Sequence, residues 1–231
     1  MRLDQNEIGN VISMNSFKQD NDMQAPAEVR AYWETLRRGQ LVPYRSEVDP
    51  RAIENTLPYA FIGEKVAPGH VRLRIAGTHL TDLMGMEVRG MPLSAMFDPT
   101  ARKQLSEALE QVFDGPAAVS MSLTGDTGFR RPELVARLVL LPMRNDLGDV
   151  SRVLGCLESS GRTGRTPRRF VISDTRVNRL RSTPTIPAKD GDEEAPIRKP
   201  LTGFREPRPV FKSAVPNPAA PWLRVVKNDD E

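Results

Sequence analysis

Three short runs within residues 43–93 constrain this chain more than any other feature. They read PYRSEVDP at 43–50, RIAGT at 74–78 and GMEVRGMPL at 85–93. Their prolines and glycines favour turns and tight connections of the backbone. Their charged residues do not assemble a nucleophile with its base, or a set of metal ligands. The runs therefore indicate a pocket wall, and they favour sensing or docking over catalysis.

Residues 59–66 and 71–76 are predicted to form paired strands across a short turn that contains proline and glycine. The second strand alternates apolar residues with charged ones. This alternation predicts that Val71, Leu73 and Ile75 share one face of the sheet and that arginines occupy the other.

One longer amphipathic helix and three more strands are predicted further along the chain. The helix covers residues 99–113, and the strands cover 117–123, 132–143 and 150–159, separated by turns rich in Gly and Asp. Residues 170–172 could extend the last strand or start a helix, and the pattern leaves both open. The predicted order is two strands, short helices, one longer helix and three strands.

Two Asp-Pro pairs predict helix starts, because Asp accepts a hydrogen bond from a free N–H and Pro fits the first helical position. Asp98-Pro99 begins the longer helix. Asp49-Pro50 begins a short helix that is expected to bury Ile53 and Leu57.

A leading helix is predicted to begin at Pro26, whose missing N–H is harmless in a first turn. Val29, Tyr32, Trp33 and Leu36 then recur at helical spacing and form one apolar stripe. This stripe is interpreted either as cover for the sheet of its own chain or as the interface of a homodimer.

In this order the three runs resemble the signatures of a compact bacterial subfamily of PAS domains, P-x-R-S-x-x-D-P, R-x-A-G-T and G-x-E-x-x-G. The resemblance covers about residues 28–180. It implies an α+β PAS fold with a five-stranded antiparallel sheet, short helices on one face and a leading N-terminal helix. It also implies a regulatory role in signal transduction. The residues that it marks as structural are Arg45, Asp49, Arg74, Gly77, Thr78, Gly85, Glu87 and Gly90.

A PAS domain can hold a small apolar molecule beneath its helices, and methionines would make such a pocket adaptable. Arg74 and Glu87 are interpreted either as an ion pair that pins the short helices to the sheet or as part of a polar ligand site. Arg45 and Asp49 allow the same two interpretations. The candidates for the pocket wall are Leu73, Ile75, Leu83, Met84, Met96, Phe97, Leu109, Met121 and Leu138.

The two ends of the chain are expected to be unstructured. Residues 1–24 are polar and of mixed charge, and are expected to be flexible. Residues 182–231 hold nine of the 20 prolines and few aliphatic runs. We therefore expect a PAS domain with its leading helix over 25–180 and a disordered, proline-rich tail over 181–231.

The net charge of +3, from 33 basic and 30 acidic residues, gives no global argument for nucleic-acid binding. Arginines are nevertheless concentrated between Arg162 and Arg181, where Asp174 is the only acid. This segment is interpreted as a solvated linker. The alternative function is that of a nucleic-acid or anionic-surface binder working through these arginines.

The sequence predicts neither a cofactor nor a metal. Haem-binding PAS domains use a histidine on their longer helix, and residues 99–113 contain none. His70 and His79 lie far from any cysteine and make a poor zinc site. The lone Cys156 is interpreted as a buried structural thiol, and a single cysteine fits a reducing cytoplasm.

The sequence contains no catalytic motif, no secretory leader and no apolar run long enough to span a bilayer. We therefore expect a non-enzymatic, colourless, cytoplasmic sensor. It is expected to bind a small apolar molecule and to signal through an unidentified protein partner or as a homodimer.

Overall fold

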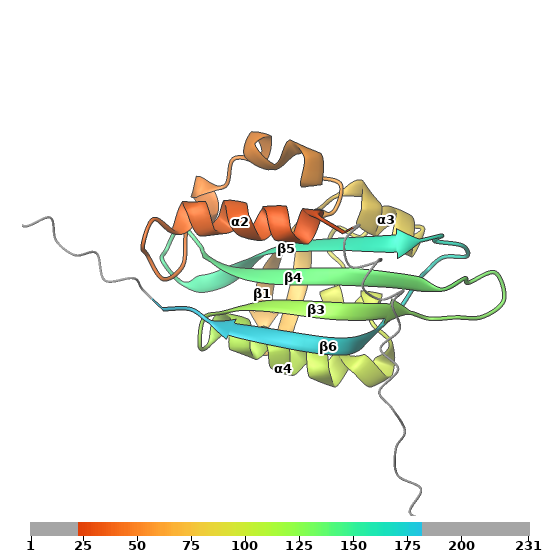
Figure 1. Cartoon of the computed structure of the whole chain (residues 1–231). Coiled ribbons are helices and arrows are strands. Elements are labelled where there is room, and N and C mark those ends of the chain that lie inside the picture. Colours follow the sequence, from red (N-terminus) through yellow and green to blue (C-terminus); the bar gives the residue numbers. More distant parts are fainter. Residues whose placement is uncertain (1–22, 182–231) are drawn as a thin grey trace, which may run out of the picture. The chain divides into compact units, whose positions relative to one another are not determined.

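A computed structural model of the chain describes residues 23–181 (Figure 1). The expectations for the flexible N-terminus and for the proline-rich tail fall almost wholly outside these residues. The described elements, with 3₁₀ helices labelled η, are α2 (Ala25–Arg37), η1 (Arg45–Glu47), η2 (Pro50–Thr56), β1 (Ala60–Ala67), β2 (His70–Ala76), α3 (Thr78–Met84), η3 (Leu93–Met96), η4 (Pro99–Ala101), α4 (Arg102–Phe113), β3 (Ala117–Gly125), β4 (Leu134–Arg144), β5 (Val150–Gly161) and β6 (Phe170–Arg179).

The strands form one antiparallel sheet of six strands in the order β2-β1-β5-β4-β3-β6 (Figure 1). The predicted α+β PAS fold is confirmed, but the predicted count of five strands is wrong. The additional strand, β6, begins at the residues whose structure the sequence left open, and it pairs with β3 along its length. Only Phe170 and Ile172 of β6 are buried, so the rest of this edge strand lacks the apolar alternation that indicates a strand.

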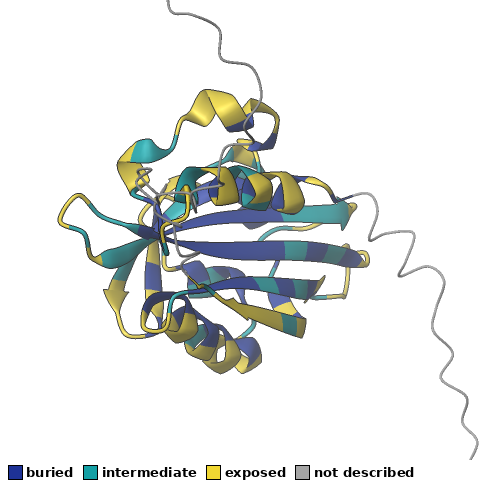
Figure 2. Ribbon diagram, turned by 60° about the vertical axis from the view of Figure 1, so that its left-hand side comes forward, coloured by how far each residue is buried: buried dark blue, intermediate teal, exposed yellow. Residues whose placement is uncertain are grey.

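The helices α3, η3 and α4 cover one face of the sheet, which we call the inner face (Figure 1). Figure 2 shows α4 with its exposed side turned away from the strands. The predicted helix at 99–113 is confirmed as η4 followed by α4, and the Thr100 N–H donates to the Asp98 carboxylate at 3.0 Å. The buried residues of α4 lie on one face, as expected for an amphipathic helix, and are Leu105, Ala108, Leu109, Val112 and Phe113.

The helix α2 covers the opposite, outer face of the sheet, over β4 and β5 (Figure 1). Val29 and Trp33 are completely buried there. The Trp33 Nε1–H donates to the Pro142 carbonyl at 2.9 Å. At the start of the helix, the Ala25 N–H donates to a Glu158 carboxylate oxygen at 2.9 Å.

These contacts decide between the two interpretations of the apolar stripe. Val29 and Trp33 cover the sheet of their own chain, so they offer no surface to a second subunit. The predicted homodimer interface is therefore wrong for these two residues. Tyr32 and Leu36, the other members of the stripe, are only partly buried.

The crossover from β5 to β6 is held in place by Arg168, whose side chain is fully buried. Its Nη2 donates to the carbonyls of Asp126 at 2.8 Å and Pro132 at 2.9 Å. Its Nε donates to the Asp126 carboxylate at 3.1 Å, and its Nη1 donates to the Thr163 carbonyl. A planar guanidinium can satisfy this many acceptors at once, so Arg168 ties the crossover to the β3–β4 turn.

We expect Arg168→Met to lower the free energy of unfolding by about 3 kcal/mol, because it leaves several buried acceptors without a donor. Urea unfolding of the full chain measures this change. The control is Arg165→Met, in an exposed position of the same crossover, which should change stability by less than about 0.5 kcal/mol. Equal effects of the two substitutions would contradict the role given to Arg168.

We expect Trp33→Ala to lower the free energy of unfolding by about 3–5 kcal/mol, because it leaves a cavity between α2 and the sheet. The oligomeric state at native conditions should not change, since the indole lies on its own chain. Urea unfolding and size-exclusion chromatography measure the two quantities, with the exposed Glu34→Ala as a control on the same helix. A variant of unchanged stability that loses a dimer would restore the interface interpretation.

Candidate functional site

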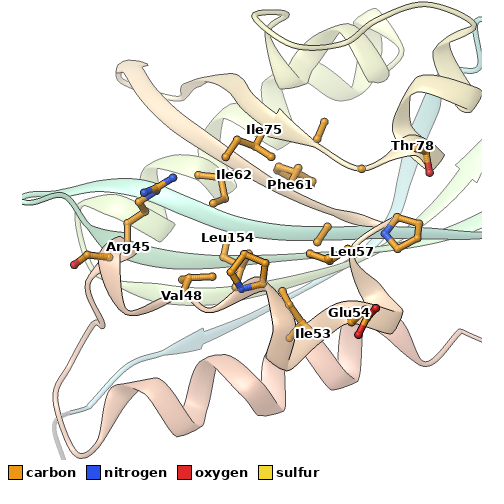
Figure 3. A pocket seen from close by; sticks show the side chains of 16 residues that line it. Arg45, Val48, Ile53, Glu54, Leu57, Phe61, Ile62, Ile75, Thr78 and Leu154 are labelled. Carbon is orange, nitrogen blue, oxygen red and sulfur yellow. The ribbon is translucent and has the colours of Figure 1, made fainter.

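A groove of about 700 Å³ opens on the outer face of the sheet, between an arm formed by η1 and η2 and the strands β1 and β2 (Figure 3). We call it the outer groove. Two of the three runs singled out in the sequence, 43–50 and 74–78, supply parts of its wall. The lining is mainly aliphatic and includes Arg45, Val48, Ile53, Leu57, Ile62, Ile75 and Leu154.

Hydrogen bonds to α2 and to β4 fix the base of the arm. The Tyr32 hydroxyl accepts the Asp49 N–H at 2.7 Å and lies 3.3 Å from the Asp49 carbonyl, to which it donates. The Asp49 carboxylate accepts the Arg51 N–H at 3.0 Å, which confirms the predicted helix cap. The Arg144 N–H donates to the Pro43 carbonyl at 2.8 Å. Tyr32, predicted to lie at a dimer interface, therefore fixes the arm to α2.

Gly77 allows the end of the arm to lie directly against the end of β2. Its N–H donates to the Ala60 carbonyl at 2.8 Å. A Cβ at this position would collide with the carbonyl oxygens of Leu57 and Pro58. The glycine of the RIAGT run is thus required by a close approach of two backbones. Thr78, which follows this glycine, is the first residue of α3 and lines the groove.

The third run lies outside the outer groove and covers the free edge of β2. The Gly90 N–H donates to the Leu73 carbonyl at 2.8 Å, and the Leu73 N–H donates to the Met91 carbonyl at 2.9 Å. Gly85 ends α3 with a φ of 68°, a left-handed conformation that glycine adopts without strain.

Ile75 reaches the groove through a β-bulge. Ile62 pairs with Ile75 and Gly63 pairs with Leu73, which leaves Arg74 as an extra residue on β2. The bulge shifts the alternation by one and turns Ile75 to the outer face. The prediction that Ile75 shares the face of Leu73 is therefore wrong. Leu73 is fully buried in the inner core, whereas Ile75 is 52% exposed.

A polar cavity of about 250 Å³ adjoins one end of the groove, and Arg45 and Ile75 line both. In this cavity the Glu64 carboxylate forms ion pairs with Arg74 and Arg152. The hydrogen bond from Arg152 is the main cause that lowers the pKa of Glu64, and Arg74 adds to it. These three charged groups make the cavity polar, next to the apolar wall of the groove.

The predicted ion pair between Arg74 and Glu87 is wrong. Arg74 pairs with Glu64, which lies across the strands, and the Glu87 carboxylate accepts the Arg89 N–H at 2.9 Å. Arg45 does not form an ion pair with the Asp49 carboxylate either. Among the described residues, its guanidinium forms no hydrogen bond or ion pair.

Eight of the nine predicted pocket residues fill the inner core, and none of them lines the outer groove. Each is at most 3% exposed. Their methionines pack between the helices and the sheet, where flexible side chains fill irregular space. These eight residues are Leu73, Leu83, Met84, Met96, Phe97, Leu109, Met121 and Leu138.

The arginine-rich segment Arg162–Arg181 does not behave as a solvated linker. Its second half is the strand β6, and Arg168 is buried. On β6 the Arg176 Nε lies 3.2 Å from a carboxylate oxygen of Asp174. The structure gives no support to the nucleic-acid alternative.

Cys156 is buried in β5 beneath α2, which confirms its interpretation as a structural thiol. Burial strongly raises the pKa of the thiol. His79 shares a 3.0 Å hydrogen bond with Ser159, and burial lowers the pKa of its imidazole. Within residues 23–181 no three His, Cys, Asp or Glu side chains gather in a way that could hold a metal ion.

A family model described as a PAS domain matches residues 22–158, more than half of the 231 residues. The chain belongs to the PAS-domain family. The match ends within β5, so the crossover with Arg168 and the additional strand β6 lie beyond it.

The chain is also similar to solved structures of light-oxygen-voltage domains. The light-state structure of the blue-light photoreceptor Aureochrome1 LOV is 13% identical, with a TM-score of 0.34, over 48% of this chain and 88% of that one. An RNA-binding Light-Oxygen-Voltage receptor is 19% identical, with a TM-score of 0.35, over 52% of this chain and 34% of that one. At such TM-scores these structures carry no conclusion about what this chain binds. No curated protein matches the chain.

Membership of the PAS family makes the domain a sensory module of signal transduction, and PAS domains commonly mediate protein contacts and dimerisation. The helices of residues 23–181 are all too short or too polar to cross a membrane.

Proposed function

We propose that this chain is a non-enzymatic PAS regulator that takes its input from a small apolar molecule in the outer groove. It passes that input on through contacts with a protein partner. The groove itself carries the proposal, because its volume of about 700 Å³ lies within the range of ligand sites. At its rim Ile75 is 52% exposed and Leu57 is 38% exposed. Large apolar side chains grouped at a surface in this way favour binding.

The wall of the groove suggests how binding would be transmitted. One side belongs to the arm, and the other belongs to β1 and β2, so a molecule between them contacts both. The arm is joined to α2 through Tyr32 and Asp49. Filling the groove therefore fixes the arm relative to the sheet and to α2, and changes the surface that the outer face offers to a partner.

The chemistry of the wall supports binding without catalysis. Aliphatic side chains and backbone make up most of it, and these groups position a ligand but transfer no proton or electron pair. The module needs no cofactor for this role. We place it in the cytoplasm of a bacterium, on the resemblance of its three runs and on its single thiol.

We expect Ile75→Gln to weaken binding of the neutral dye Nile red to the full chain by about fivefold, since part of an apolar side chain is lost from the wall. Fluorescence titration measures the affinity, and circular dichroism checks that the variant is folded. The matched control is Val66→Gln on β1, which has a nearly equal exposure of 51% and lies outside the groove. Its affinity should equal that of the unsubstituted chain.

The proposal would be overturned by a chain that does not bind the dye at all. It would also be overturned if the two substitutions weakened binding equally, because the dye would then bind away from the outer groove.

A further inference from the structure

Arg45 is an arginine with unused hydrogen-bonding capacity at the edge of an apolar groove. Its guanidinium forms no hydrogen bond or ion pair with any described residue. The neighbouring Arg74 and Arg152 differ from it, since both are paired with Glu64. An arginine presents five N–H donors in a planar fork that suits a carboxylate, so Arg45 is free to bind an anion.

The position of Arg45 gives the groove two unlike ends. Arg45 lines both the apolar groove and the adjoining polar cavity. Figure 3 shows its guanidinium directed from the arm across the groove toward Ile62, while Leu57 and Glu54 lie at the other end. A ligand that spans the groove therefore has the guanidinium of Arg45 at one end and aliphatic side chains along the rest of its length.

The charges around the polar end favour an anion there. The polar cavity is lined by Arg45, Arg74 and Arg152, against the carboxylates of Glu64 and Asp146. These three arginines and two carboxylates leave the lining with a net charge of +1, and Arg45 is the arginine that is not paired with Glu64. At the far end the only charged lining residue is Glu54, which disfavours a second anionic group.

We propose that the outer groove binds a linear amphipathic acid, with one carboxylate on Arg45 and an aliphatic chain along Ile62 and Ile75 toward Leu57. This inference rests on the proposed function, because it names the ligand of that same groove. Aliphatic carboxylates of medium length combine the two properties that the groove presents, an anionic head and an unbranched apolar body.

Isothermal titration calorimetry of the full chain at neutral pH tests the inference with decanoate and with 1-decanol, its neutral counterpart. The unsubstituted chain should bind decanoate more tightly than 1-decanol, and added salt should weaken only the binding of decanoate. Arg45→Gln should lower the affinity for decanoate by about fivefold and leave the affinity for 1-decanol unchanged. The matched control is Arg51→Gln, in an exposed position of η2 that does not line the groove.

The outcomes separate this inference from the proposed function. Equal affinity for decanoate and 1-decanol, or an equal loss of both on Arg45→Gln, would overturn the anionic ligand while leaving an apolar groove that binds. A chain that binds neither compound would overturn the inference and contradict the proposed function as well. Loss of decanoate binding on Arg51→Gln would show that the carboxylate is held elsewhere, and would overturn the role of Arg45.

Discussion

The contact between Trp33 and the outer face of the sheet supports most of what lies above that face. The indole is completely buried and donates its Nε1–H to the Pro142 carbonyl, which fixes the position of α2 on β4. Tyr32 then reaches Asp49 and holds the beginning of η2. Since η2 forms one side of the outer groove, the width of the groove depends on a helix that does not itself line it.

The other side of the groove depends on two departures from regular strand geometry. The bulge at Arg74 turns Ile75 outward, and the missing side chain of Gly77 lets the arm close against the end of β2. The same bulge brings Arg74 to Glu64, so a single extra residue creates both the apolar wall and part of its polar end. The PAS framework of this chain thus has a groove on the face opposite α3, η3 and α4.

Strong local chemistry made much of the fold predictable from the sequence. The helix α4 and the caps at Asp49 and Asp98 follow from periodicity and short-range hydrogen bonding. The strand β6 was missed because it lies at the edge of the sheet and buries no residue beyond Ile172, so it has no apolar alternation there. The three runs predicted a pocket wall, and two of them line the outer groove. The individual pocket residues followed from apolar periodicity, which indicates burial and not open space. Ile75 is therefore the only predicted pocket residue that lines the groove. Nothing in the sequence distinguished Arg168 from its neighbours, because its acceptors are backbone atoms of a distant turn.

Methyl NMR of the full chain with decanoate tests most directly whether the ligand lies on the outer face. Ile62 and Ile75 line the outer groove, whereas Met96 and Met121 lie in the inner core. The account predicts nuclear Overhauser effects between the decanoate chain and the δ1 methyl groups of both isoleucines, and none to the methionine methyl groups. Contacts with Met96 and Met121 without contacts to the isoleucines would place the ligand beneath the helices and contradict the account.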